Sequence, residues 1–359
     1  MKKTRLALAL ASCLMAGSAM AQSSVTVSGL VDAFAGSLKN SGDTGSKASV
    51  GSGGLTTSWI GFKGVEDLGG GLKAEFALTS FFQTDTGASG RFSGDNLFSR
   101  DANIALSGSY GRFMMGRGLA PSFLPTVLFN PFGDSFTFSP LVLHVYTPSG
   151  NFGARTWAQA NAADSGWSNE IIYTTPKFGG LQANLHYQFG EVAGQTGKKN
   201  IGANVLYFNG GLALTGLYFD AQASNPNSGA AVIDATAPIS SVTRQKTAMV
   251  GATYDFQVVK LYGTYQISKD TTAGTPEMKD KLASVGISAP IGNGSLLVGY
   301  ANTKRSGSLI GNDVSRNTTS VGYDYFLSKR TDLYAIVMSD KVTTFGRSNG
   351  FGLGIRHRF

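Results

Sequence analysis

The residue types that most often carry catalysis or bind metals are scarce in this sequence. Histidine occurs only at His144, His186 and His357, and cysteine only at Cys13. None of these positions lies at the spacing of a zinc site or another metal site. A Ser/His/acid hydrolase would need an organised set of residues around a histidine, and no histidine here has such a motif. We therefore expect no catalytic residues, no metal and no cofactor.

The Gly-rich run at residues 64–71, Gly-Val-Glu-Asp-Leu-Gly-Gly-Gly, also lacks the chemistry of a phosphate-binding loop. No Gly-Lys-Ser/Thr follows it, and no helix starts there. Glu66 and Asp67 are more simply polar residues of a turn. The chemistry that remains is that of charged side chains facing a water-filled passage, where they would bias the movement of ions.

These charged residues lie on segments in which apolar and polar residues alternate. In residues 181–189, Leu, Ala, Leu, Tyr and Phe fall on one side, and Gln, Asn, His and Gln on the other. The same alternation runs through residues 247–256, 259–268 and 351–359. A period of two with one apolar face predicts a half-buried strand. A soluble β-sandwich is the alternative, but sandwiches rarely need strands this uniform over so long a chain.

The number and spacing of these segments favour a barrel that crosses a membrane. Most have about ten residues, the length at which a tilted strand crosses a bilayer. The sixteen expected strands are residues 25–34, 55–65, 72–84, 97–107, 111–118, 168–175, 181–190, 201–209, 212–222, 246–256, 260–270, 281–290, 295–304, 316–326, 331–341 and 351–359. The fold class is therefore all-β, a 16-stranded antiparallel transmembrane β-barrel.

The links between these strands alternate in length. The short links are residues 66–71, 108–111, 176–180, 209–211, 256–259, 291–294 and 327–330. The long links are residues 35–54, 85–96, 119–167, 191–200, 223–245, 271–280, 305–315 and 342–350. Short periplasmic turns and long extracellular loops are typical of outer-membrane barrels.

The composition excludes several other classes. The chain is 42% hydrophobic and only 14% charged, yet its one continuous apolar stretch, residues 6–17, is shorter than the roughly 20 residues of a spanning helix. A helical membrane protein is thus excluded, and a single cysteine excludes a disulfide scaffold. The net charge of +8 is only a weak argument for acidic partners. We expect no nucleic-acid partner.

Residues 1–21 have the form of a secretory signal peptide. Three basic residues precede the apolar stretch, and Ala19-Met20-Ala21 fits a cleavage site. A lipobox ending at Cys13 is the alternative, but cutting there would leave Ala19–Ala21 unexplained and only about seven apolar residues in the signal. Residues 22–359 would then form the barrel, with 27 basic and 22 acidic residues, a net charge of +5 and no cysteine.

One link, residues 119–167, is far longer than the others. A loop of this length without elements of its own usually serves a function. Because a sixteen-stranded barrel encloses a wide aqueous lumen, the loop would narrow that lumen if it folded inward. A surface lid or an extra hairpin is the alternative.

Taken together, several motifs resemble the Gram-negative trimeric general porins of the β-proteobacterial and neisserial type. They occur in the family's order over nearly the whole mature chain: residues 23–29 with Asp32, 61–64 with 66–74, Gly116-Arg117, 130–133, 173–176 with 178–180, 327–332, and Arg356-His357-Arg358-Phe359. The resemblance implies a homotrimer in the outer membrane and a third loop folded into each lumen. It also implies that Phe359 is a signal for the barrel-assembly machinery.

The resemblance further implies a constriction lined by arginines on strands 2, 4 and 6. Only the strand-4 position is kept, as Arg100, and Trp59 and Trp167 stand at the other two. Alternation places Trp59 on the face opposite Ile60 and Phe62. Alternation places Arg100 on the same face as the apolar residues Ala102, Ile104 and Leu106. Either a bulge near Asp101 turns Arg100 to the other face, or those apolar residues lie at a subunit interface. Arg117 has the same ambiguity.

The candidate constriction residues are therefore Trp59, Arg100, Arg117 and, from the long loop, Asp134, Arg155 and Trp167. Lys63, Lys73 and Glu75 lie close to the turn at residues 66–71, so we expect them in the periplasmic vestibule.

The predicted function is a passive outer-membrane diffusion channel for small hydrophilic solutes and inorganic ions, with a modest preference for anions. An outer-membrane β-barrel enzyme or adhesin without a conducting pore is the alternative.

Overall fold

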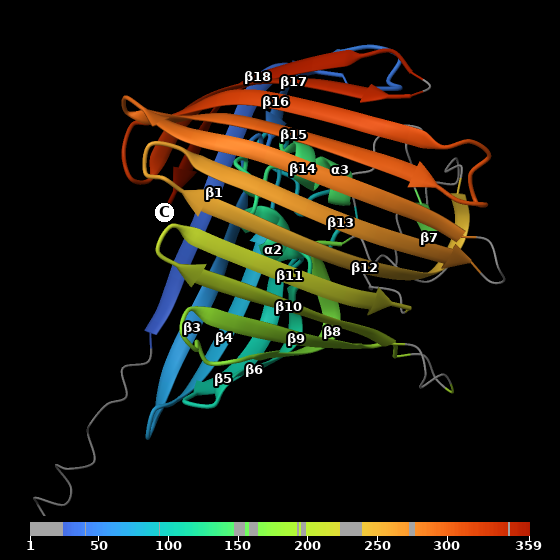
Figure 1. Ribbon diagram of the computed structural model, residues 1–359. Coiled ribbons are helices and arrows are strands. Elements are labelled where there is room, and N and C mark those ends of the chain that lie inside the picture. Colours follow the sequence, from blue (N-terminus) through green and yellow to red (C-terminus); the bar gives the residue numbers. More distant parts are fainter. Residues whose placement is uncertain are drawn as a thin grey trace, which may run out of the picture.

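A computed structural model shows a ring of strands that closes on itself (Figure 1). It describes residues 24–359 apart from 40, 93, 147–154, 158–163, 192–193, 195–198, 223–238, 273–276 and 344. The expected signal peptide, residues 1–21, lies outside the described residues. Neither described helix is long or apolar enough to cross a membrane.

Sixteen strands form the wall of the barrel. They are β1 (Ser24–Leu38), β3 (Trp59–Gly69), β4 (Leu72–Phe81), β5 (Asp101–Gly108), β6 (Gly111–Leu119), β8 (Gly166–Thr174), β9 (Leu181–Phe189), β10 (Lys199–Asn209), β11 (Leu212–Ala221), β12 (Ile239–Asp255), β13 (Lys260–Thr272), β14 (Glu277–Ile291), β15 (Gly294–Ser306), β16 (Val314–Phe326), β17 (Thr331–Val342) and β18 (Ser348–Arg358). Each corresponds to one expected strand, so the predicted fold class is confirmed.

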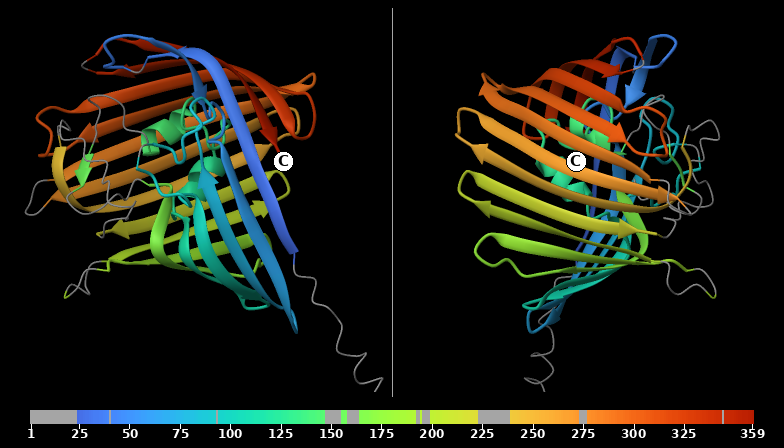
Figure 2. Two further views of the ribbon diagram at one scale, coloured as in Figure 1. Left: turned by 180° about the vertical axis from the view of Figure 1, so that it is seen from behind. Right: turned by 45° about the vertical axis from the view of Figure 1, so that its right-hand side comes forward.

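The ring closes because β1 pairs antiparallel on both of its edges. Its first half pairs with β3, from Ser24↔Val65 to Leu30↔Trp59, and its second half pairs with β18, from Leu30↔Arg358 to Ser37↔Phe351. Figure 2 shows the blue first strand lying against the red last strand. A closed ring leaves no unpaired edge, which is what a spanning sheet requires.

Two short strands and two helices were missed by the sequence interpretation. Strand β2 (Lys47–Ser52) pairs with β1 inside the expected loop 35–54. Strand β7 (Arg155–Trp157) pairs parallel with β12, the one exception to antiparallel pairing among the described strands. Helices α2 (Phe123–Leu128) and α3 (Pro140–Tyr146) lie in the long loop. None of these has enough residues to show a period in the sequence.

The boundaries near the first short turn also differ from expectation. Strand β3 continues to Gly69, with a register shift between Asp67 and Gly69, so the turn is shorter than predicted. The Asp67 side chain accepts a hydrogen bond from the Gly69 amide at 2.9 Å. The backbone at Gly70 has a φ of +61°, a conformation that glycine adopts without strain.

The two faces of the wall differ as alternation predicts. Large apolar side chains such as Val250, Val285 and Leu353 are exposed on the outer face. Their strand neighbours face the interior, where polar side chains such as Thr247, Ser284 and Asp340 are buried. An exposed apolar band outside a polar interior is the surface that a bilayer covers.

Candidate pore constriction

The segment that follows β6 lies inside the ring of strands. Figures 1 and 2 show α2 and α3 within the barrel rather than over its rim. The turn between the helices is organised by Asn130. Its amide nitrogen donates to the Thr126 and Gly133 carbonyls at 2.8 and 2.9 Å, and its Oδ1 accepts from the Phe132 amide and the Ser139 hydroxyl. The Asn130 side chain therefore bonds to residues on both sides of it in the chain and holds the turn together.

Glycines on the inner face of the wall let this segment approach closely. A Cβ at Gly286 would lie 2.6 Å from Pro131, and one at Gly352 would lie 2.6 Å from the Phe138 ring. Phe132 packs in the same way against Gly299. Larger residues at these positions would push the segment off the wall, because a well-packed site cannot absorb added atoms cheaply.

Polar contacts fix α3 against β15 and β16. The two ring nitrogens of His144 lie 2.8 Å from the hydroxyls of Thr303 and Thr318. The Ser320 hydroxyl donates to the Phe138 carbonyl at 2.7 Å, and Arg316 reaches the Leu143 carbonyl. Burial lowers the pKa of His144 well below its ordinary value, and the nearby Arg316 guanidinium lowers it further.

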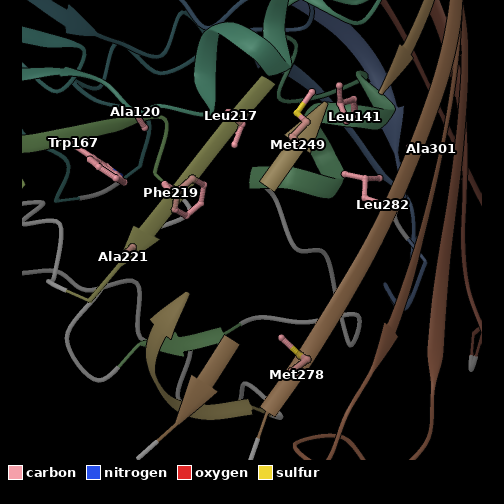
Figure 3. Close-up of a cluster of buried hydrophobic side chains, with 10 residues drawn as sticks. All are labelled: Ala120, Leu141, Trp167, Leu217, Phe219, Ala221, Met249, Met278, Leu282 and Ala301. Atoms are coloured by element: carbon pink, nitrogen blue, oxygen red, sulfur yellow. The ribbon is translucent and has the colours of Figure 1, made fainter. Parts of the chain in front are cut away.

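An apolar cluster joins the segment to β11, β12, β14 and β15 of the wall. Figure 3 shows Leu141 of α3 beside Met249 and Leu282, and Trp167 beside Phe219. Trp167 is fully buried and meets the Phe219 ring edge-on at 6.0 Å between centroids. This tryptophan stands where the family resemblance implied an arginine. Its ring packs against other side chains of the wall and is not exposed to open water.

The tip of the segment carries Asp134. Its carboxylate accepts a hydrogen bond from the Thr56 hydroxyl at 2.9 Å, and Thr56 also accepts one from Arg356 at 2.9 Å. Burial raises the pKa of Asp134, while the Thr56 hydrogen bond and the charges of Arg356 and Arg100 oppose that rise. The tip thus lies in the field of cations from both sides of the lumen.

The stretch that presents Thr56 is held by Asp32. This buried carboxylate accepts hydrogen bonds from the amides of Gly54, Leu55 and Thr56, each at 2.9 Å, and one from the Tyr334 hydroxyl at 2.5 Å. Because these amides bond to a side chain, they are unavailable to the ladder. This explains why β3 begins at residue 59 rather than at 55.

Trp59 and Arg100 meet across the wall. Trp59 lies opposite Phe81 on the face away from the exposed Ile60 and Phe62, as alternation predicted. The Arg100 guanidinium lies over the Trp59 ring at 4.1 Å and pairs with Asp101 at 2.9 Å. The Arg100 side chain keeps 25% of its surface exposed. It is therefore a stacked but solvent-accessible cation.

Arg100 does not share the outward face of Ile104 and Leu106, because it precedes the first residue of β5. That strand begins at Asp101, and Arg100 occupies a bend whose amide bonds to the Thr79 carbonyl at 3.3 Å. The alternation of β5 then exposes Ile104 and Leu106 on the outer face. The bend thus accounts for the position of this arginine.

Arg117 turns inward through a bulge and is buried. The register of β6 against β8 shifts between Gly116 and Gly118, and Gly116 has a φ of +125°. The Arg117 guanidinium donates to the Ser99 carbonyl at 2.6 Å and to Asp164 at 2.9 Å. It is only 5% exposed, so it serves as a structural anchor.

Asp164 binds a second arginine from another loop. Arg91 donates to Asp164 at 2.6 Å and to Asp95 at 2.8 Å. Burial by itself would raise the pKa of Asp164, but the charges of Arg91 and Arg117 outweigh burial and lower it. The pair of arginines therefore holds the end of the long segment to the neighbouring loop as a fixed anion.

Two of the three residues predicted for the vestibule, Lys63 and Glu75, line a cavity of about 350 Å³ on the inner wall of β3–β10. Glu75 accepts hydrogen bonds from Ser107 at 2.5 Å and from Arg112 at 2.8 Å. Lys63 lines the same cavity, and its ammonium lies 5.9 Å from the Trp59 ring centre. Lys73 is exposed next to the first short turn.

Two further predicted residues have distinct surroundings. Arg155 lies in β7, and only its backbone belongs to the described part of the structure. Phe359 follows β18, and its amide and carbonyl both bond to Gly29 of β1 at 3.1 Å. The last residue thus closes the ring next to the first strand.

The sequence analysis did not include the arginines of the opposite wall among the candidate lumenal residues. Arg305 pairs with Asp280 at 2.7 Å, Arg316 with Asp340 at 2.9 Å, and Arg356 with Asp332 at 2.9 Å. Alternation placed Arg356 on the polar face, but nothing local to these strands indicates a partner on the next one. Among the described residues there is no group of three or more His, Cys, Asp or Glu that could hold a metal ion.

Comparison with known proteins assigns this geometry to a family. A family model described as Gram-negative porin matches residues 7–344. The chain is 32% identical to Outer membrane porin protein 32 of Delftia acidovorans over the whole length of both chains. The chain belongs to the Gram-negative porins. It is an outer-membrane porin that forms a passive diffusion channel for small hydrophilic solutes.

Other relatives of this porin agree. It is 31% identical to an outer membrane porin protein of Bordetella pertussis, again over the full length of both. A solved structure titled as an anion-selective porin from Comamonas acidovorans superposes with a TM-score of 0.76 at 27% identity, covering 94% of this chain and 100% of that one.

Proposed function

We propose that solutes cross this porin between the inward segment and the wall formed by β3–β6, and that the passage modestly prefers anions. The observation that carries this proposal is the stacked pair of Arg100 and Trp59, with 4.1 Å between guanidinium and ring. Among the strands, α3 has its most extensive described contacts with β15, followed by β14 and β16, on the other side of the lumen. The constriction would then be formed by Trp59, Arg100 and Asp134, and Arg117 would support it from behind.

Stacking explains how a single arginine can act there. A guanidinium over an indole ring gains about 0.5–2 kcal/mol, which holds the charge in place while leaving it hydrated. Lys63 and Arg112 continue the cationic lining below it. The cations Arg100, Lys63 and Arg112 would therefore line a short stretch of the passage rather than form a ring at one level.

The expected preference is modest because carboxylates accompany the cations. Asp101 pairs with Arg100 at 2.9 Å and Glu75 with Arg112 at 2.8 Å. In water, two unit charges 4 Å apart interact by only about 1 kcal/mol. A few net charges therefore bias traffic several-fold and cannot make a strict filter. The similarity to a porin whose structure is titled anion-selective supports the same sign.

The reversal potential of the purified protein in a planar bilayer under a KCl gradient tests this proposal. We expect stable ohmic conductance and a reversal potential of the sign that indicates chloride preference. A cation preference would contradict the proposed lining. Absence of conductance from correctly folded protein would favour the alternative of a barrel enzyme or adhesin.

We propose a homotrimer as the assembled form. The family resemblance implies it, and an apolar hollow of about 750 Å³ on the outer face of β1 and β16–β18 supports it. Small side chains, Ala33 and Ala35, border this hollow beside Leu353. Light scattering of the detergent complex should give three chains per particle, and a monomer would contradict the proposal.

We propose that Phe359 is read by the barrel-assembly machinery. Its ring is 45% exposed beside the closing strand pair, where a protein factor could reach it before closure. Deletion of Phe359 should reduce the amount of folded barrel in the outer membrane without changing export across the inner membrane. Unchanged amounts of folded protein would contradict this role.

A further inference from the structure

An apolar row interrupts the polar inner face of the barrel at β5, β6 and β8. Ala105, Met114 and Ile172 are buried and form one apolar cluster. The register sets Ala105 opposite Met114, and Met114 opposite Ile172. Their strand neighbours Ile104 and Met115 are exposed on the outer face, so the row itself faces the interior. A passage for hydrated ions alone has no use for such a row.

This row forms the floor of the cavity of about 350 Å³ described above, which we call the wall cavity. Met114 and Ile172 line it from the wall, and Leu124 of α2 lines it from the inward segment. The Asn204 amide donates to the Pro121 carbonyl at 2.8 Å and so fixes the start of that segment over the floor. Sites for small organic molecules have volumes of about 300–1,000 Å³ and a largely apolar lining.

Charged side chains flank the floor on both sides. The register carries the row of Lys63 to Asn103 of β5, which lies two residues from Ala105 towards the long-loop end. Arg112 lies two residues from Met114 towards the short turn. Inward rows two residues apart are separated by about 7 Å. Both cations therefore lie within reach of a small molecule placed on the floor.

The ion pairs around the wall cavity leave one cation over. Arg112 pairs with Glu75 at 2.8 Å, and Arg100 pairs with Asp101 at 2.9 Å. None of the ion pairs within the described residues includes Lys63, whose ammonium lies 5.9 Å from the Trp59 ring centre. The two carboxylates of the lining are thus already paired. The cavity offers one ammonium group to a single negative charge.

This combination selects one class of solute. An inorganic anion would pair with Lys63 but leave the apolar floor uncovered. A neutral apolar molecule would cover the floor but leave the ammonium without a partner. A zwitterion would need a second carboxylate, and both Glu75 and Asp101 are engaged. A monocarboxylate with an apolar body satisfies the floor and the ammonium together.

We propose that the wall cavity is a binding site for monocarboxylates that carry an apolar body about the size of a benzene ring. The carboxylate accepts hydrogen bonds from Lys63, and the body lies on Met114 and Ile172. The inference rests on the proposed solute path along β3–β6 and names a solute class for it. A site on a diffusion path must bind weakly enough to release its solute, and one exposed ammonium meets that requirement.

Titration of benzoate against the chloride current of the porin in a planar bilayer tests this site. We expect a saturable fall of the current with benzoate. Acetate has the charge without the ring, and benzyl alcohol has the ring without the charge. Each should act at least about tenfold more weakly, because each loses one of the two contacts. Equal potency of benzoate and acetate, or of benzoate and benzyl alcohol, would overturn the proposal.

Two variants separate the contacts. Lys63→Gln should weaken benzoate binding about fivefold, as expected for one charge acting through water. Its matched control, Lys329→Gln, alters an exposed lysine on a short turn outside the cavity and should change binding less than twofold. Unchanged benzoate affinity of the Lys63→Gln variant would overturn the proposal.

Met114→Gln should weaken benzoate binding by a similar factor while leaving the weak effect of acetate unchanged, because it makes the floor polar. Met338→Gln is the matched control, since Met338 is also buried but lies outside the cavity, on β17. If Met114→Gln failed to fold, Ala77→Leu would fill the cavity from β4 instead. Unchanged benzoate binding by the folded floor variant would overturn the proposal.

Thermal conversion of the folded porin in detergent distinguishes this inference from the proposed path. A ligand that binds the folded state raises its conversion temperature whether or not the channel conducts. Benzoate should raise this temperature for the wild type and not for Lys63→Gln. Anion preference without any rise by benzoate would overturn the inference and leave the path standing. A rise that Lys63→Gln abolishes, in a porin that prefers cations, would support the site and contradict the path.

Discussion

The inner faces of β14–β18 and of β3–β6 carry similar numbers of cations but use them differently. On β14–β18, which we call the packed wall, the side chains of Arg305 and Arg316 are 3% and 0% exposed and each pairs with an aspartate on the adjacent strand. On β3–β6, the open wall, Arg100 and Arg112 are 25% and 34% exposed. Arg316 also donates a hydrogen bond to the carbonyl of Leu143 in α3, so this buried arginine lies against the inward segment.

This comparison shows what makes a charge structural or functional in a barrel. A buried pair contributes little net attraction because desolvation opposes it, but it costs much to break. An exposed cation keeps its hydration and can act on ions in the lumen through water. Buried anchors for the inward segment thus occur on both walls, at Arg316 and Arg117, whereas the exposed cations Arg100 and Arg112 lie on the open wall.

The largest expected effect comes from breaking the packed wall. Replacing Asp340 with alanine leaves the fully buried Arg316 without its carboxylate, and also removes acceptors for the Ser41 amide and the Thr318 hydroxyl. Loss of one partner of a buried pair costs about 3–5 kcal/mol. The temperature at which the folded species converts in detergent should fall clearly.

Asp101→Ala is the matched control on the open wall. Its partner Arg100 is partly exposed, so we expect a cost of about 1 kcal/mol or less. Equal losses of thermal stability in the two variants would show that the walls do not differ as we describe.

A smaller effect on the packed wall should depend on pH. Burial lowers the pKa of His144 below its ordinary value, so the docked segment binds fewer protons than a free imidazole with a pKa of about 6.5. Docking is therefore favoured above that pH and weakens as the pH falls below it. Single-channel current fluctuations should increase on acidification, and His144→Gln should remove that dependence. Fluctuations that grow with rising pH would contradict this sign.

On the open wall, we expect changes in ion preference with only a small loss of stability, because the stack of Arg100 on Trp59 gains about 0.5–2 kcal/mol. Trp59→Arg should increase anion preference and Arg100→Ala should reduce it, each by a few-fold, because the charges act through water. The reversal potential in a KCl gradient measures both. If neither substitution moves it, the passage does not follow the open wall.

The smallest effect is expected at the vestibule. Lys73 is exposed next to the first short turn, and we expect Lys73→Gln to change stability by less than about 0.5 kcal/mol. Its effect on the reversal potential should be smaller than that of Arg100→Ala. A larger effect would move the selective region towards the periplasmic end.

The alternating pattern by itself determined the wall of this porin. All sixteen expected strands are present, and most of their bounds fit within about four residues, although β12 begins at Ile239, seven residues before its expected start. Asp32 shortened β3 by binding the amides of residues 54–56, and a register shift lengthened it at the turn. Strand alternation is readable because it depends only on the direction of successive side chains along one backbone.

Tertiary structure decided which candidate residues could act on ions. The sequence placed Arg100, Arg117 and Trp167 in one group, but a bend left Arg100 accessible, a bulge buried Arg117 against Asp164, and Trp167 packed on Phe219. It also gave no sign of α2, α3 or the arginine–aspartate pairs of the packed wall. Coverage and pairing depend on contacts between residues up to hundreds of positions apart, such as Arg316 with Leu143, and no local pattern encodes those contacts.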